Sequence, residues 1–209
     1  MVHFKPETIA SLDKNYRTNL INEISGGKPA CLIGTKDSSG TNNLAIFSNI
    51  IHIGANPALI GILFRPITDR NHTYQNIKTT QYFTLNHIES SFIEKAHFTS
   101  AAFPGDISEF DTCQLSPEIL EGFEAPFVKE SQVKIGLKFI EEQFIKTNHT
   151  ILVIGQVEHI FIPKEGLDDE GNVLLETLNG VSIGGLNTYY KLSEIGRFPY
   201  AKTDQIPHF

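Results

Sequence analysis

The chain has 209 residues, of which 40% are hydrophobic and 20% charged, as is typical of an ordered globular protein. The formal net charge is −7 and no cluster of lysine and arginine stands out, so the sequence does not support a nucleic-acid partner. The N-terminus has no apolar signal core and no apolar run approaches the roughly 18 residues of a membrane span, so we expect a cytoplasmic protein without a membrane partner.

The first 27 residues predict an arm followed by a helix. Residues 1–10 show no clear pattern and are expected to form the arm. Either Ser11 or Asp13 can cap the helix that follows, and Gly26-Gly27 ends it. The apolar side chains at helical spacing are Tyr16, Leu20, Ile21 and Ile24.

Three strands are predicted next. Residues 30–35 form the first strand, and Asp37-Ser38-Ser39-Gly40 supplies a hairpin turn. Residues 43–53 read as one long second strand. A third strand, residues 58–64, follows the turn Gly54-Ala55-Asn56-Pro57.

The segment after the third strand carries groups that bind anions. Arg65, Arg70, His72 and Thr73 lie around the start of a predicted helix, residues 71–78, with Asn71 at its first position. A guanidinium offers paired donors, and a helix N-terminus adds backbone N–H groups and a partial positive charge. The pattern therefore predicts a phosphate site, and the alternative is a solvated loop in which Asn71 only caps the helix.

The second half of the chain continues the β pattern. A strand is expected over 82–88, a helix from Ser90-Ser91 through Ala96, and an irregular segment over 99–126 that we interpret as a lid or interface loop. Two long strands, 132–144 and 150–162, follow. An acidic loop (163–172), a glycine-rich stretch (180–190) and an extended tail complete the chain.

This order of elements favours a mainly β protein, an antiparallel barrel with peripheral helices. No G-x-G-x-x-G follows a strand, so a Rossmann site is not supported. Cys31 lies in an apolar run and is expected to be a buried free thiol. The histidines have no metal-binding spacing, so no metal site is predicted. His149 lies at a predicted turn, either exposed or near a cofactor.

Several short motifs together resemble the flavin reductase-like, FMN-binding split-barrel family. They occur in the family's order, from Pro29 to about Ile160. The matching stretches are Pro29-Ala30-x-Leu32-Ile33, Asn43-Leu44-Ala45-Ile46-Phe47-Ser48, Asn56-Pro57-x-Leu59, His72-Thr73-x-x-Asn76-Ile77, Tyr82-x-x-x-Asn86 and the strand from His149 to Val157.

The resemblance implies a Greek-key split β-barrel, one domain over residues 1–209 with an N-terminal arm (1–10) and a C-terminal extension (180–209). It also implies a homodimer with FMN at the subunit interface. The phosphate would lie near residues 65–73, and the flavin ring along Asn43, Leu44, Ala45, Ile46, Phe47 and Ser48. Ile46-Phe47 stands where many relatives carry small hydroxyl residues, so backbone groups would make more of the ring contacts.

Two polar groups outside these motifs have two interpretations each. Thr99-Ser100 is placed near the cofactor by the resemblance, or simply ends a helix. Asn187, Tyr189 and Tyr190 could close over a flavin, or pack the C-terminus.

Three functions fit the sequence. The first is an FMN-dependent oxidoreductase that reduces flavin, bound or free, with NADH or NADPH, in which the cofactor carries the hydride chemistry. The second is an FMN-binding electron carrier without nucleotide turnover. The third is a non-flavin barrel that binds another phosphorylated ligand.

Overall fold

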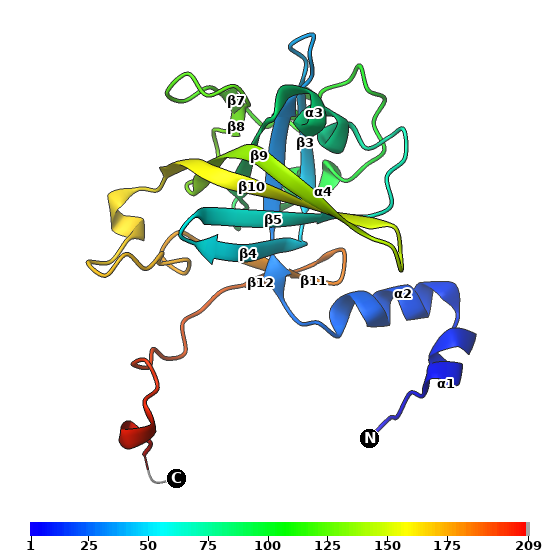
Figure 1. Cartoon of the computed structure of the whole chain (residues 1–209), viewed down its shortest axis with the longest axis vertical. Helices are drawn as coiled ribbons and strands as arrows, with labels where there is room; N and C mark the ends of the chain where they lie inside the picture. Colours follow the sequence, from blue (N-terminus) through cyan, green and yellow to red (C-terminus); the bar gives the residue numbers. More distant parts are fainter. Residues whose placement is uncertain (208–209) are drawn as a thin grey trace.

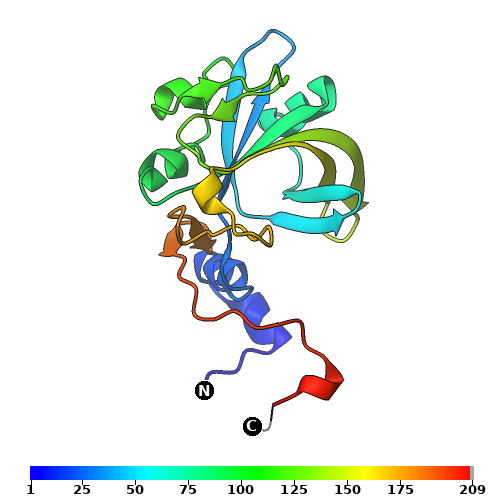
Figure 2. The same cartoon turned by 90° about the vertical axis from the view of Figure 1, so that its left-hand side faces the viewer.

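Seven antiparallel strands form the main sheet, which curls into a barrel (Figures 1 and 2). The computed structural model describes residues 1–207. From one edge to the other the strands are β3 (Asn42–Phe47), β2 (Cys31–Lys36), β6 (Tyr82–His87), β9 (Lys134–Ile145), β10 (Thr150–Phe161), β5 (Ala58–Phe64) and β4 (Ile50–Ala55). The predicted antiparallel barrel is therefore confirmed.

The prediction of one long strand over residues 43–53 is wrong. The chain forms β3, breaks at Ser48-Asn49, and then forms β4 at the opposite edge of the sheet. The Asn49 carbonyl already accepts a hydrogen bond from the Leu63 N–H at 3.0 Å, so the chain has joined the β5 side at this point. Sequence periodicity does not show this change of partner, because both halves are apolar and β-branched.

The hairpin β9–β10 is the longest pairing and agrees with the alternating pattern of the sequence. Its register runs from Thr150 opposite Ile145 to Phe161 opposite Lys134. His149 lies at the turn with a φ of 60°, exposed to solvent. Of the two interpretations of His149, the structure shows the exposed turn residue.

Strand β2 is buried on both faces, so two cores meet at it. Cys31 and Ile33 point into the barrel, where they pack with Phe64 and Phe83. Leu32 points to the other side, into a cluster with the helices and the C-terminal hairpin. Both cysteines are buried and free, which confirms the prediction for Cys31.

Small elements cover the ends of the barrel. The helices of the body are α3 (His72–Thr80), α4 (Ile93–Phe98) and α5 (Glu109–Thr112), with the 3-10 turn η1 (Lys164–Gly166). A second sheet contains β1 (Lys28–Pro29), β11 (Val181–Gly184) and β12 (Thr188–Lys191) in the order β1-β11-β12. The third pairs β7 (Pro117–Glu118) with β8 (Phe127–Val128).

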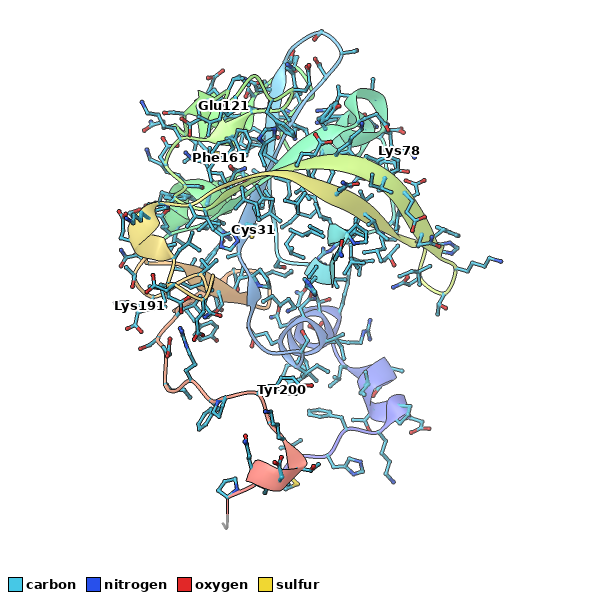
Figure 3. The ribbon with its side chains drawn as sticks, turned by 60° about the vertical axis from the view of Figure 1, so that its left-hand side comes forward. Cys31, Lys78, Glu121, Phe161, Lys191 and Tyr200 are labelled. Atoms are coloured by element: carbon cyan, nitrogen blue, oxygen red, sulfur yellow. The ribbon has the colours of Figure 1, made fainter. Side chains whose placement is uncertain are left out.

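Both ends of the chain extend away from the barrel (Figures 1 and 3). The predicted arm is helical in part, since α1 (Pro6–Ser11) precedes α2 (Lys14–Glu23). Asp13 is the cap of α2, because its carboxylate accepts hydrogen bonds from the N–H groups of Asn15 and Tyr16. The tail, with η2 (Thr203–Gln205), carries exposed aromatic side chains, Phe198 and Tyr200. No helix within residues 1–207 is long and apolar enough to cross a membrane.

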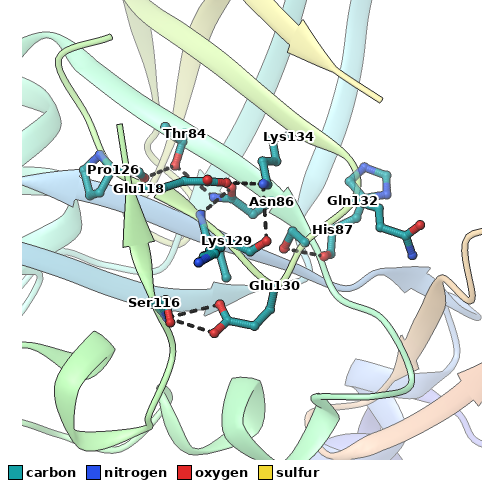
Figure 4. A network of polar contacts seen from close by, with 12 residues as sticks. Thr84, Asn86, His87, Ser116, Glu118, Pro126, Lys129, Glu130, Gln132 and Lys134 are labelled. Carbon is teal, nitrogen blue, oxygen red and sulfur yellow. Dashed lines mark hydrogen bonds and ion pairs between the residues drawn. The ribbon is translucent and has the colours of Figure 1, made fainter. Parts of the chain in front are cut away.

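The segment predicted as a lid, residues 99–126, is anchored more firmly than expected. Phe110, Cys113 and Leu115 are buried in the core beside β3. Figure 4 shows the polar contacts that hold the end of this segment and the chain after it. Asn86 accepts from the Val128 N–H at 3.0 Å, and Thr84 donates to the Pro126 carbonyl at 2.6 Å. These contacts anchor the segment from Phe110 onward, whereas residues 101, 102 and 104–107 are exposed.

Asn86→Ala tests this anchoring. The side chain is fully buried, accepts from Val128 and donates to the Leu32 carbonyl and Thr84 Oγ1, so its removal leaves buried groups unpaired. We expect a loss of about 1–3 kcal/mol in the free energy of unfolding, measured by urea denaturation. The exposed Asn15→Ala should change it by less than about 0.5 kcal/mol. Equal, small effects in both variants would contradict the anchoring role.

Candidate functional site

One cavity of about 630 Å³ lies beside β3. Its walls come from the end of β5, the start of α3, the chain after α4, α5 and the tip of the β11–β12 hairpin. Every site residue predicted from the sequence lines it except Leu44, namely Asn43, Ala45, Ile46, Phe47, Ser48, Arg65, Arg70, Asn71, His72, Thr73, Thr99 and Ser100. The structure thus brings together residues that the chain separates by more than fifty positions.

The loop between β5 and α3 gives the cavity a cationic end. Arg65 and Arg70 are exposed, and His72 is half-buried at the first position of α3. None of these three forms an ion pair within residues 1–207. Their donors are therefore free for an anionic ligand.

Asn71 shapes this loop instead of capping α3. Its side-chain oxygen accepts from the Thr68 N–H at 2.6 Å and the Thr68 hydroxyl at 3.0 Å. No side chain caps α3 at Asn71, so the first N–H groups of the helix have no side-chain acceptor there. Asn71 is the N-cap residue of α3 by position, but its side chain does not cap the helix, so the helix start keeps its partial positive charge for a ligand.

A buried polar network fixes α3 against the sheet. The Asn43 side-chain amide donates to Thr73 Oγ1 at 3.0 Å and to Thr35 Oγ1 at 3.3 Å. The Asn76 amide donates to the same Thr35 hydroxyl at 3.1 Å. Asn43 and Thr73 therefore join β3 to the start of α3, and the cationic loop is held at a fixed place relative to β3.

The outer face of α3 is tied to the barrel as well. The Tyr74 hydroxyl donates to the Glu142 carboxylate at 3.0 Å, and Lys78 lies 3.2 Å from the same carboxylate. Glu142 is on β9, so α3 is held from both sides.

Strand β3 provides the long wall of the cavity. It is an edge strand, so every second residue directs its backbone N–H and C=O away from β2. The Leu44 N–H points outward, because it donates to Glu109 Oε2 at 2.8 Å. By alternation the next outward pair belongs to Ile46, which lines the cavity.

Leu44 itself is not a lining residue. Its side chain is fully buried in the core, on the face of β3 that packs against α4 and α5. Ile46 is on the same face of β3 two residues further on, but it is only partly buried, so it reaches the cavity where Leu44 does not.

The floor of the cavity is apolar. Phe47 packs edge-to-face on Phe64 with ring centroids 5.0 Å apart. Ile46 and Phe103 lie against the core cluster of Leu44. Such a surface suits a planar aromatic group, whose faces are apolar and whose rim is polar.

Thr99 and Ser100 both end helix α4 and line the cavity. The Thr99 hydroxyl donates to the Ala96 carbonyl at 2.8 Å, and the Ser100 hydroxyl to the His97 carbonyl at 2.7 Å, so both end α4. Both residues nevertheless line the cavity.

Sequence reasoning missed several lining residues. The β1–β11 pairing brings in Ile183 of β11 and Leu186 at the hairpin tip, beside Asn187, which the sequence had already suggested. His97 lines the cavity and its Nδ1 lies 3.1 Å from the Tyr189 hydroxyl, where burial raises the pKa of Tyr189 to about 12. Ile183, Leu186 and His97 had no signal in the sequence that placed them at the site.

Glu109 is the other missed residue. It lines the cavity although it is only 6% exposed. Burial raises the pKa of its carboxyl group, while the Leu44 N–H and the nearby His72 act in the opposite direction. Nothing in the irregular segment around it marks this acid as different from Asp106 or Asp111.

The described part of the chain holds no group of three or more His, Cys, Asp or Glu side chains that could bind a metal ion. The cavity therefore offers cations at one end, an open strand edge along one wall and an apolar floor.

Residues 26–178 match the sequence model of the flavin reductase like domain. The chain belongs to this family. A protein of Shewanella frigidimarina NCIMB 400, described as a flavin reductase with a split barrel domain, is 42% identical, with a TM-score of 0.93 over 96% of this chain and 100% of that one. The split-barrel fold expected from the motifs is confirmed.

Two more distant structures share the fold of this flavin reductase-like chain. Nitrilotriacetate monooxygenase component B from Bacillus cereus is 21% identical, with a TM-score of 0.82 over 95% of this chain and 98% of that one. Flavoredoxin of Desulfovibrio vulgaris (Miyazaki F) is 22% identical, with a TM-score of 0.70 over 86% of this chain and 92% of that one.

Proposed function

We propose that this protein is an FMN-dependent oxidoreductase that uses NADH or NADPH to reduce flavin. The observation that carries the proposal is the single cavity in which a cationic loop and an open strand edge are held together by buried hydrogen bonds. Membership of the flavin reductase-like family supports flavin as the ligand.

The cationic end fits the phosphate of FMN. Arg65 and Arg70 offer guanidinium donors, and the start of α3 offers backbone N–H groups. Thr73 would keep its place through Asn43, so its backbone is positioned in advance of binding. The chain's own contribution at this end is binding and orientation.

The β3 wall fits the ring of FMN. Ile46 presents a backbone donor and acceptor to the cavity, and Phe47 gives an apolar surface. Hydroxyl side chains at positions 46 and 47 are then not needed to bind the ring, because the backbone of the open strand edge supplies the polar groups. Bound FMN supplies the hydride-accepting chemistry, and the protein holds the ring and limits water around it.

The nicotinamide nucleotide has no dedicated fingerprint in the sequence, so we propose that it binds loosely over the open face of the cavity. A second, shallower hollow of about 540 Å³ shares His97 and Asn187 with the first and extends the surface available to it. Few dedicated contacts imply a KM toward the upper end of the usual range of roughly 1 μM to 1 mM.

We also propose a homodimer. Strand β4 leaves one edge of the sheet unpaired, and the β9–β10 hairpin carries exposed apolar side chains, including Phe144 at 55% and Ile160 at 59% exposure. An obligate interface buries roughly 2,000 Å² or more with an apolar centre, which these side chains would supply.

Reduction of the bound flavin tests the proposed function. Protein loaded with FMN is mixed with NADH or NADPH without oxygen, and the flavin absorbance is followed by stopped flow. We expect at least one nucleotide to bleach the flavin at a rate that rises with its concentration. Tight FMN binding with no reduction by either nucleotide would instead support an electron carrier, for which the fold shared with flavoredoxin is a precedent.

Arg70→Ala tests the phosphate end. Loss of a hydrogen bond to a charged group costs about 1.5–3 kcal/mol, so the Kd for FMN should rise roughly tenfold to hundredfold. Riboflavin lacks the phosphate and should bind variant and parent alike in a fluorescence titration. Lys164→Ala, at an exposed site away from the cavity, is the control. Unchanged FMN affinity in Arg70→Ala would exclude it as a phosphate ligand.

Light scattering tests the assembly. We expect the parent to have twice the chain mass of 23.3 kDa at micromolar concentration. Phe144→Glu would place a charge in the apolar centre and shift the mass toward the monomer, whereas the exposed Glu121→Gln should leave it unchanged. A monomeric parent would remove the proposal.

A further inference from the structure

Glu109 is a buried acid whose hydrogen bond reaches the backbone of the strand that forms the cavity wall. It comes from the first turn of α5, and its Oε2 accepts from the Leu44 N–H at 2.8 Å. The carboxylate forms no ion pair within residues 1–207, although it faces the cavity of Arg65, Arg70 and His72. Burying a carboxylate without a paired cation is costly, so packing alone does not account for it.

This hydrogen bond lies on β3 two residues before the backbone groups of Ile46. The outward backbone groups of an antiparallel edge strand repeat every two residues, so Leu44 and Ile46 present equivalent donor and acceptor pairs. A ligand that recognises such an edge could dock at either residue. Glu109 occupies the Leu44 N–H. The next outward N–H along β3 belongs to Ile46, which lines the cavity and is left for a ligand.

The beginning of β3 is then fixed from three directions. The Leu44 side chain is buried in the core, the Leu44 N–H is held by Glu109, and the Asn43 side chain is held by Thr35 and Thr73. The same Asn43–Thr73 hydrogen bond sets the cationic loop. A ligand whose ring and phosphate are joined by a chain of fixed length can bind only if the β3 wall and the cationic loop are the right distance apart.

We propose that Glu109 is a positioning residue of the ligand site, which occupies the Leu44 N–H so that a flavin ring docks on the backbone of Ile46. The proposal rests on the flavin function proposed above. Glu109 acts through its acceptor oxygen on β3, and its negative charge is not needed for this role.

Two variants separate the acceptor from the charge. Glu109→Gln keeps an acceptor oxygen and removes the charge, whereas Glu109→Met keeps the length of the side chain and removes the strong acceptor. Asp111→Asn, exposed in the same helix, is the matched control. Circular dichroism verifies that each variant is folded.

The first measurement is amide hydrogen exchange at Leu44 without ligand. We expect exchange in Glu109→Met to be at least about tenfold faster than in the parent, because the loss of a hydrogen bond to a charged group is of that size. Glu109→Gln and Asp111→Asn should stay within about threefold of the parent, a free-energy change of under about 0.7 kcal/mol.

The second measurement is the titration of each variant with FMN and riboflavin. Glu109→Met should lose about tenfold or more in affinity for both ligands, because the effect lies at the ring and not at the phosphate. Glu109→Gln should bind riboflavin like the parent and FMN equally or more tightly, since one negative charge has left a cavity that takes an anion. This differs from Arg70→Ala, which loses affinity for FMN alone.

Three results would overturn the positioning role. They are parent-like binding by a folded Glu109→Met, an unchanged Leu44 exchange rate in that variant, or a loss in Glu109→Gln as large as in Glu109→Met. If Glu109→Met does not fold, the Glu109→Gln titration still decides, because a tenfold loss there contradicts the proposal. A parent that binds neither ligand refutes the flavin function itself, which the same titration shows separately.

Discussion

The site depends on the buried hydrogen bonds centred on the Thr35 hydroxyl. Thr35 is on β2, yet it accepts from Asn43 on β3 and Asn76 on α3, and Asn43 also reaches Thr73. Each of these four side chains is less than 9% exposed. Buried polar groups that lose a partner cost far more than exposed ones, so this network strongly favours one arrangement of strand and helix. The cationic loop and the open edge of β3 keep their mutual position for this reason.

The two ends of the cavity use different physics. The cationic end relies on charge and on the unpaired N–H groups at the start of α3, which attract any compact anion. The β3 wall relies on the backbone N–H and C=O groups of an edge strand, whose hydrogen bonds are directional but carry no net charge. An edge strand is normally a hazard for aggregation. Here α5 lies against the start of β3 through Glu109, and the cavity occupies the stretch that follows.

Sequence reasoning found what local patterns encode. Strand alternation predicted the β9–β10 hairpin, and the run from Arg65 to Thr73 predicted a cationic loop before a helix. It could not find the break at Ser48-Asn49, since apolar residues flank these two polar residues on both sides and no glycine or proline marks a turn there. It also missed Glu109, because the Leu44–Glu109 contact spans 65 residues and no periodicity links them. Ile183 and Leu186 of the β11–β12 hairpin lie at the cavity through the β1–β11 pairing, which is also non-local.

The most direct test of the account is a crystal structure of the protein grown with saturating FMN. We predict the phosphate against Arg65, Arg70 and the N-terminus of α3, and the flavin ring along β3 with a hydrogen bond to the backbone of Ile46. Flavin bound elsewhere on the barrel, or a phosphate on the hairpin side of the cavity with the loop of Arg65 and Arg70 free, would contradict the central claim that this loop and the β3 edge form one binding site.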